Sequence, residues 1–279
     1  MNKSTEKELA SHFSFGENWK QFSQIVTEEH VQFAQLDLER LLGVSSLDDK
    51  TFCDIGCGSG IHAVAAARMG AHVTALDIDP VSTRTTTDLA KKFGMRQSIS
   101  VHNNSIFHHS LTDERFDIVY SWGVLHHTGS MWEAIAEAVK LVSERPGSMF
   151  AIALYRRTRL CRFWTIEKRF YKNAHPIIQT GIRRVVSVLM GINLLLKFRG
   201  PFISRKQYQR NRGMSPGHDL HDWLGGYPYE SVTHTEILEF LGARGFVLKT
   251  ELGNRQYSRR MSLGVFGSGC DEYVFVRQV

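Results

Sequence analysis

A glycine-rich segment carries the strongest chemical signal in the sequence. Residues 51–61 read Thr-Phe-Cys-Asp-Ile-Gly-Cys-Gly-Ser-Gly-Ile, at the join between an expected strand and an expected helix. Alternating glycines permit a tight turn whose backbone approaches a ligand closely, and the following helix offers its unpaired N–H groups to that ligand. The segment therefore predicts a nucleotide-like cofactor, with contacts from Asp54, Gly56, Cys57, Gly58 and Gly60.

Two carboxylates decide which cofactor this turn suits. A carboxylate at Asp54, two positions before the first glycine, would repel a pyrophosphate but would accept hydrogen bonds from an ammonium group, which favours S-adenosylmethionine over NAD. Asp77 lies 23 residues further on, near the spacing of about 20 for a carboxylate that holds both ribose hydroxyls. The remaining expected cofactor contacts follow neighbouring strands: Ile78, Asn104, Ser105, Ser121 and Trp122. For Asn104 and Ser105, ordinary loop chemistry is the competing interpretation.

Blocks typical of strands and helices alternate up to Leu154, which predicts an α/β fold with a parallel sheet. The expected strands are 51–55, 71–76, 99–102, 116–121, 148–154, 245–252 and 272–276. The expected helices are 25–42, 61–69, 80–93, 131–142 and 231–241. The alternation of strand and helix patterns stops after Leu154 and resumes near residue 231, which indicates one long insertion. We expect an N-terminal helical lid at 1–45, a cofactor-binding domain at 46–154 and 231–279, and a basic helical substrate cap at 155–230.

Three segments together resemble the class I S-adenosylmethionine-dependent methyltransferases: Asp54 to Gly60, Asp77-Ile-Asp79, and Phe116 to His127. The segments His218 to Pro228 and Phe15 to Trp19 resemble a bacterial subgroup of small-molecule type. The resemblance runs from about Phe15 to Val276 by motif placement. It implies a Rossmann-like, seven-stranded, mostly parallel sheet with an antiparallel last strand, and a cofactor at the carboxyl ends of the strands. It names no substrate.

Charge is distributed unevenly along the 279 residues. The segment 155–213 holds fifteen Lys and Arg against Glu167 alone, whereas the rest of the chain has a net charge of −8. This asymmetry points to an anionic partner. Arginines 156, 157 and 159 could recognise a phosphate or carboxylate on the substrate, and 177–198 could lie on an anionic bilayer. RNA is disfavoured because Ser-Trp-Gly-Val follows the fourth strand, where base-amine methylases have an Asn-Pro-Pro-Tyr type motif.

Histidines supply the candidate catalytic groups. His218 and Asp222 are four residues apart, so in a helix they share a face, and the carboxylate could orient the imidazole as a general base. A capping and packing role for the pair is equally favoured. His126 is a further catalytic candidate because it stands just past the fourth strand, although it and its neighbour could instead shape the cofactor pocket. No metal site is predicted, since His218-x-x-His221 alone supplies too few ligands.

Aromatic and polar residues around the insertion predict a wall against the substrate. The candidate residues for substrate binding are Trp19, His127, Tyr155, Arg156, His221, Trp223, Tyr227 and Tyr229. For any one of the aromatic residues, ordinary core packing is the competing interpretation. Trp19 and Phe15, placed ahead of the first helix, could fold over the cofactor.

The composition indicates a cytoplasmic protein. Four cysteines without pairing rhythm indicate a reducing compartment, the first twenty residues lack a secretory pattern, and the longest apolar stretch, 185–196, is too short for a membrane span. We expect methyl transfer to an oxygen, or less favourably a nitrogen, of a small anionic or lipid-linked metabolite. The alternatives are a membrane-associated quinone or lipid-precursor methyltransferase, an RNA methyltransferase, an NAD-dependent oxidoreductase and an inactive cofactor-binding protein.

Overall fold

A single mixed sheet organises the described part of the chain. The computed structural model describes residues 9, 15–197, 216–253, 263–265 and 269–278. Its sheet has the order β3-β2-β1-β4-β5-β7-β6. Neighbours from β3 to β5 pair in parallel, and β7 runs antiparallel to both β5 and β6. The strands are β1 (Thr51–Ile55), β2 (His72–Asp77), β3 (Ile99–Asn103), β4 (Ile118–Trp122), β5 (Met149–Tyr155), β6 (Phe246–Leu252) and β7 (Cys270–Arg277). The predicted sheet, with its antiparallel last strand, is confirmed.

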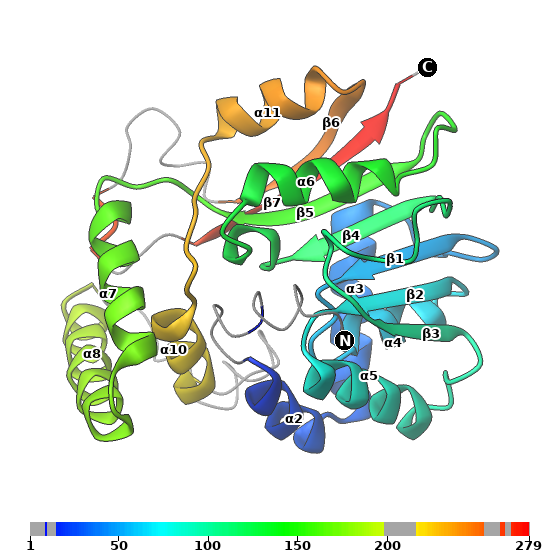
Figure 1. The fold of residues 1–279 in the computed structure, drawn as a ribbon. Coiled ribbons are helices and arrows are strands. Elements are labelled where there is room, and N and C mark those ends of the chain that lie inside the picture. The colour runs from blue at the N-terminus through cyan, green and yellow to red at the C-terminus, as the bar shows by residue number, and fades with distance from the viewer. Residues whose placement is uncertain (1–8, 10–14, 198–215, 254–262, 266–268, 279) are drawn as a thin grey trace.

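Helices cover both faces of the sheet and create two separate cores (Figure 1). On one face lie α3 (Glu28–Leu42), α4 (Ile61–Arg68) and α5 (Pro80–Lys92), and on the other α6 (Met131–Lys140) and α11 (His234–Gly242). Strands such as β4 and β5 are buried on both faces, which explains their continuous apolar sequence. The carboxyl ends of the parallel strands are left free to hold a ligand.

The N-terminal region differs from the single helix predicted for 25–42. Two helices occupy it, α2 (Gly16–Ile25) and α3, and they are separated at Thr27. The Thr27 backbone N–H donates to Nδ1 of His30 at 3.2 Å, which caps α3 in the manner of a capping box and ends the helical run before it. Trp19 therefore lies within a helix rather than ahead of the first one.

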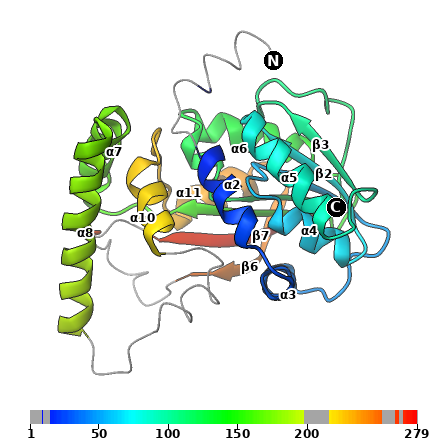
Figure 2. The same cartoon turned by 90° about the horizontal axis from the view of Figure 1, so that it is seen from below.

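The insertion forms a helical group beyond the ends of β4 and β5. It contains α7 (Cys161–Asn173), α8 (Pro176–Lys197) and α10 (Pro216–Gly225), and α10 lies between α7 and α2 in two perpendicular views (Figures 1 and 2). Three of its buried side chains, Tyr171, Leu220 and Leu224, form a small hydrophobic cluster apart from the two cores of the sheet. None of the described helices is long and apolar enough to cross a membrane.

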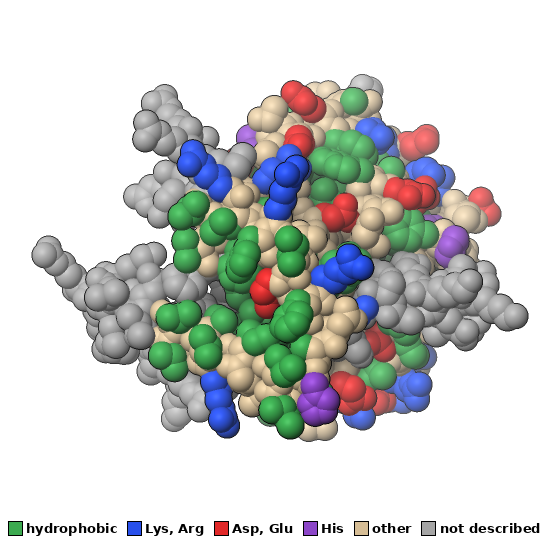
Figure 3. All heavy atoms as spheres, turned by 60° about the vertical axis from the view of Figure 1, so that its left-hand side comes forward, with side chains coloured by type: hydrophobic (Ala, Val, Ile, Leu, Met, Phe, Trp, Pro, Cys, Tyr) green, Lys and Arg blue, Asp and Glu red, His purple; other side chains and the backbone are tan. Residues whose placement is uncertain are grey.

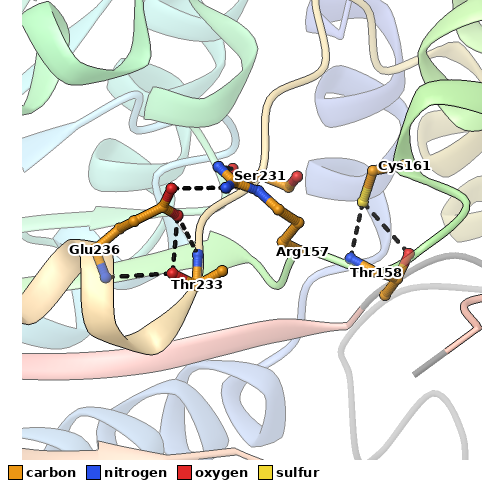
Figure 4. Close-up of polar contacts among 6 residues, drawn as sticks. All are labelled: Arg157, Thr158, Cys161, Ser231, Thr233 and Glu236. Carbon is orange, nitrogen blue, oxygen red and sulfur yellow. Dashed lines mark hydrogen bonds and ion pairs between the residues drawn. The ribbon is translucent and has the colours of Figure 1, made fainter. Parts of the chain in front are cut away.

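Two arginines fasten the start of the insertion to the sheet domain. Arg156 binds both carboxylate oxygens of Asp271 on β7, with Nε at 2.6 Å from Oδ2. Arg157 donates to Oε1 of Glu236 at 2.6 Å and to the Ser231 carbonyl at 2.9 Å (Figure 4). Glu236 also completes the capping box of α11 with Thr233. Part of the basic charge of the insertion therefore stabilises the fold, and the predicted role of Arg156 in substrate binding stays a prediction.

The ion pair between Arg156 and Asp271 gives the first testable prediction. Asp271 has a side chain only 9% exposed, so Arg156→Gln leaves a nearly buried carboxylate without its charged donor. We expect the free energy of unfolding to fall by about 1–3 kcal/mol, measured by urea denaturation. Arg159→Gln, at an exposed position, should change the free energy of unfolding by about 0.5 kcal/mol or less. Equal effects of the two substitutions would contradict this role for Arg156.

Candidate cofactor and acceptor site

The glycine-rich turn joins β1 to α4 and is held by close contacts on both sides. Gly58 and Gly60 have φ angles of 53° and 81°, a region that favours glycine. A Cβ on Gly60 would lie 2.8 Å from the Cα of Thr86, so α5 can approach the turn only because this residue is glycine. A Cβ on Gly58 would lie 3.1 Å from the indole of Trp19. The turn is thus packed between α5 and α2.

Asp77 ends β2 and points its carboxylate at this turn. Its Oδ2 accepts a hydrogen bond from the Gly58 N–H at 2.9 Å, and its Oδ1 accepts one from the Asp79 N–H at 2.9 Å. Burial raises the pKa of Asp77 to about 6, against the opposing effect of these backbone donors. Each carboxylate oxygen retains a further lone pair, so the arrangement suits the predicted contact with two ribose hydroxyls.

Asp54, at the end of β1, is a buried carboxylate without a donor among the described residues. Desolvation, followed by the nearby charge of Asp77, raises the pKa of Asp54 to about 7. A buried carboxylate is costly unless a cation or donor pairs with it. The ammonium group of S-adenosylmethionine would supply that pairing, so the residues present fit this cofactor.

The edge next to Asp77 is built by the last residue of β3 and the residues that follow it. The side-chain amide of Asn103 donates to the carbonyls of Asp77 and Ile78, at 3.0 Å each. The Asn104 backbone N–H donates to the Asp77 carbonyl at 3.1 Å, and Ser105 Oγ accepts from the Phe107 N–H at 3.2 Å. Sequence reasoning missed Asn103, although a polar residue ending the third strand was an available signal. The cofactor contacts of Asn104 and Ser105 stay predictions.

Three other expected cofactor contacts have protein partners of their own. Ser121 Oγ donates to the Ile55 carbonyl at 3.1 Å, and Cys57 Sγ accepts from Thr86 Oγ1 at 3.3 Å. Trp122 is 44% exposed and its indole N–H donates to Glu272 on β7 at 2.7 Å. These contacts position the ends of β1 and β4. The predicted contact of each side chain with the cofactor stays a prediction.

The N-terminal helix lies over the cofactor turn. The Gly16 N–H donates to Oδ2 of Asp79 at 3.1 Å, which ties the start of α2 to the residue following Asp77-Ile78. The ring centroid of Phe15 lies 5.6 Å from that of His127, and Trp19 lies against Gly58. The same helix thus contacts both the glycine turn and the histidine pair. This placement is what the lid hypothesis requires.

A cluster of rings lies past the ends of β4 and β5. His126 and His127 belong to a short 3-10 helix, η1 (Leu125–His127). The His126 ring lies 4.4 Å from His127 and 4.1 Å from Tyr155 between centroids, and Tyr155 lies 5.3 Å from Tyr229. Burial, with the nearby charges of His127 and then Lys168, holds the pKa of His126 well below its usual range. His126 is therefore neutral near pH 7.

The remaining candidate residues lie on or beside α10. His221 Nδ1 lies 2.8 Å from the Tyr171 hydroxyl, and Trp223 packs on Trp164 with centroids 4.7 Å apart. Tyr227 lies 6.0 Å from the Lys172 ammonium. His218 and Asp222 lie within α10 as the helical hypothesis requires, but their side chains fall outside the described part of the structure. Their proposed partnership stays a prediction.

Two features of this region escaped sequence reasoning. Lys168 on α7 is 1% exposed, although lysine almost never is so buried, and its sequence position carries no distinguishing pattern. Cys161 begins α7 and accepts hydrogen bonds from the Thr158 backbone N–H, at 3.1 Å (Figure 4). Burial raises the pKa of its thiol, but hydrogen bonds, the strongest with Ser231, together outweigh burial and hold this pKa below its usual value. Among the described side chains, no group of His, Cys, Asp and Glu could hold a metal ion.

Comparison with known proteins assigns the sheet domain. Residues 53–152 match the model of the "Methyltransferase domain" family. A ubiquinone biosynthesis O-methyltransferase of Methylobacterium sp. (strain 4-46) is 34% identical over 117 residues, which cover 42% of this chain and 45% of that protein. The chain thus matches less than half the length of this curated relative.

Solved structures agree on the fold. The magnesium protoporphyrin IX methyltransferase of Synechocystis PCC 6803 with bound S-adenosylhomocysteine has a TM-score of 0.54 at 15% identity and covers 94% of this chain and 93% of its own. A putative S-adenosylmethionine-dependent methyltransferase of Listeria monocytogenes has a TM-score of 0.52 at 14% identity, and the match covers 89% of this chain and 99% of that one. At such identities the likeness concerns the fold.

The sheet order, the turn and the two carboxylates define a class I S-adenosylmethionine-dependent methyltransferase fold. Residues 53–152, about a third of the chain, carry the match to the methyltransferase-domain family. The predicted family and fold class are confirmed, and S-adenosylmethionine agrees with them as the cofactor of this class. The insertion at 155–230 lies outside the matched residues, so the acceptor is not identified by this match.

The raised pKa of Asp54 predicts a pH dependence of cofactor affinity. Since only the ionised carboxylate attracts an ammonium group, S-adenosylhomocysteine should bind more tightly as the pH rises through about 7, the pKa of Asp54. Well below that pH, the affinity should change by up to about tenfold per pH unit in calorimetric titrations. Asp54→Asn should lower the affinity and remove the rise near pH 7, whereas Asp88→Asn, at an exposed position of α5, should preserve it. An unaltered profile in Asp54→Asn would refute the assignment.

Proposed function

We propose that the protein is an S-adenosylmethionine-dependent methyltransferase that acts on an oxygen of a small anionic or lipid-linked metabolite. The observation that carries the proposal is the buried Asp54 carboxylate beside the glycine-rich turn, within residues that match a methyltransferase domain. A buried carboxylate at this point suits the cationic end of S-adenosylmethionine and opposes the pyrophosphate of NAD.

The cofactor supplies an activated methyl group on a sulfonium, so the chain has mainly to bind, orient and exclude water. Asp77 would hold the ribose through two charge-assisted hydrogen bonds, and Asp54 would hold the ammonium group. Trp19, against Gly58, would close the site from the N-terminal side. The acceptor would then approach from the side of η1 and α10.

The choice of acceptor rests on the insertion, because the matched domain ends at residue 152. The ring cluster of His126, Tyr155 and Tyr229 supports an acceptor with a planar or apolar part. A screen of cell extract with a labelled methyl donor would identify the acceptor without presupposing its class. The protein's cytoplasmic location stays a prediction.

Cofactor choice tests the proposed function directly. S-adenosylhomocysteine should release heat on binding, whereas NADH under the same conditions should not. Asp77→Ala should lower the affinity for S-adenosylhomocysteine by tenfold or more, since each lost charge-assisted hydrogen bond contributes on the order of 1.5–3 kcal/mol. A folded Asp77→Ala variant with unchanged affinity would refute the ribose assignment. Tight NADH binding without S-adenosylhomocysteine binding would refute the methyltransferase proposal.

A second candidate, action at a membrane surface, is favoured by the outer face of α7 and α8. Figure 3 shows hydrophobic side chains gathered on one side of the molecule with basic side chains at its margin. The exposed apolar residues of α7 and α8 are Phe163, Ile166, Phe170, Ile177, Ile178, Val185, Val188 and Leu189. Among the described residues of these two helices, Glu167 is the one acid. Apolar side chains flanked by Arg and Lys match an anionic bilayer, where a quinone or lipid-precursor acceptor would be found.

Membrane docking predicts sedimentation with vesicles that contain phosphatidylserine and not with vesicles of phosphatidylcholine alone. Arg183→Glu combined with Arg184→Glu should weaken that binding by at least tenfold, because each basic residue near the surface contributes about 1 kcal/mol. As a control, Lys91→Glu combined with Lys140→Glu makes the same change of charge on α5 and α6. This variant should bind the phosphatidylserine vesicles as the wild type does. Absence of sedimentation at low salt would overturn the membrane proposal and leave the methyltransferase proposal intact.

A further inference from the structure

Lys168 on α7 is a buried cation that forms no ion pair with a carboxylate among the described residues. It is 1% exposed, and its ammonium donates to the backbone carbonyl of Trp223. Two of its three N–H groups lack an acceptor among the described residues. Glu167 is next to it in the helix. The Glu167 carboxylate is buried without a hydrogen-bond partner among the described residues, and its charge attracts Lys168 although no ion pair joins the two. A buried charge in this state is costly unless something pairs with it.

Aromatic rings surround the Lys168 ammonium without supplying a counter-charge. Its Nζ lies 4.8 Å from the ring centroid of Trp223, 5.3 Å from that of Tyr229 and 6.0 Å from that of Tyr155. Ring faces stabilise a cation only modestly. Burial still lowers the pKa of Lys168 to about 8, against the attraction of Glu167. The surroundings therefore tolerate the cation but do not neutralise it.

His126 presents a second unsatisfied donor to the same cluster. Its side chain is fully buried, and its Nε2 has no hydrogen-bond partner among the described residues. The Tyr155 backbone N–H donates to His126 Nδ1 at 3.4 Å, so in the neutral imidazole the proton resides on Nε2. The rings of His126 and Tyr155 are in contact, and Lys168 lies beside Tyr155. Tyr155 is therefore the shared neighbour of both donors.

This cluster adjoins the cofactor turn. The side chain of Val124, two residues before His126, packs directly against Gly56 of the cofactor turn. The contact with the turn and the buried histidine therefore lie two residues apart in the chain. An acceptor bound beside His126 would lie next to the place where the cofactor turn holds the methyl donor.

We propose that Lys168 and His126 form an oxyanion site for the methyl acceptor, which is a planar compound bound through an ionised oxygen of phenolate, enolate or carboxylate type. The inference rests on the proposed function and assigns His126 a donor role rather than that of a base. The bound oxyanion forms a bond with the methyl carbon as the carbon–sulfur bond breaks, and the electron pair stays on sulfur. No proton moves in this step. The methylated oxygen is neutral, so it loses its attraction to Lys168 and product release is favoured.

The test uses 4-nitrophenol as a probe, because its ionised form absorbs visible light. Bound to the full chain, with S-adenosylhomocysteine present and absent, the probe should ionise at a pH lower by about one unit or more than in water, since an adjacent cation favours the charged form. The shift should persist at high salt, because a buried charge is screened far less than the exposed arginines. Lys168→Met should remove the shift. Lys172→Met, one turn further along α7, should retain it.

The outcomes separate this inference from the proposed function. A shift that persists in a folded Lys168→Met variant, or one that disappears at high salt in the wild type, would overturn the oxyanion site. So would a failure of 4-nitrophenol to bind the wild type at millimolar concentration. Two of these outcomes are measured on the wild type alone. The test therefore remains valid even if the Lys168→Met variant does not fold. Loss of S-adenosylhomocysteine binding, measured separately, would instead refute the methyltransferase proposal.

Discussion

The hydrogen bond from the Gly58 N–H to the Asp77 carboxylate couples the parts on which the cofactor site depends. It joins the turn after β1 to the end of β2, and the next carboxylate, Asp79, receives the N–H of Gly16 at the start of α2. Parallel strands bring their carboxyl ends to one edge, so two short segments distant in sequence meet there. Asp54 adds a second buried carboxylate at the same edge. Both the shape of the site and its negative charge thus result from the carboxyl ends of parallel strands lying at one edge of the sheet.

The insertion is a basic segment whose charges serve different purposes. Arg156 and Arg157 bind Asp271 and Glu236, so they hold the chain where it leaves β5 and where it returns before α11. Lys168 is buried among aromatic rings. Exposed arginines such as Arg162 and Arg184 remain available to an anionic partner. Net charge alone would assign all of these residues to one surface, whereas their contacts divide them into fastening, interior and surface groups.

The sequence predicted the sheet because its signals are local. Most strands are short, largely apolar runs close to a glycine, proline or aspartate, and the turn at 56–60 needs its glycines for steric reasons. It did not predict the break at Thr27, since the cap depends on a side-chain contact with His30. The partner of Arg156 lies 115 residues away, and the ring cluster draws on β5, η1 and the segment after α10. Such long-range pairings leave no periodicity to detect.

Opposite charges stand on the two sides of η1. The side of the glycine-rich turn holds Asp54 and Asp77, and the side of α7 holds Lys168, with Glu167 next to it, and a neutral His126. This order suits a reaction between a cationic donor and an anionic acceptor, because each partner meets its counter-charge and the two partners attract each other. Methyl transfer would cancel the charge of the sulfonium and that of the oxyanion, so Lys168 would lose its attraction for the methylated acceptor, whereas the ammonium group assigned to Asp54 stays on S-adenosylhomocysteine. A general base would be unnecessary for such an acceptor, because its oxygen would already be ionised.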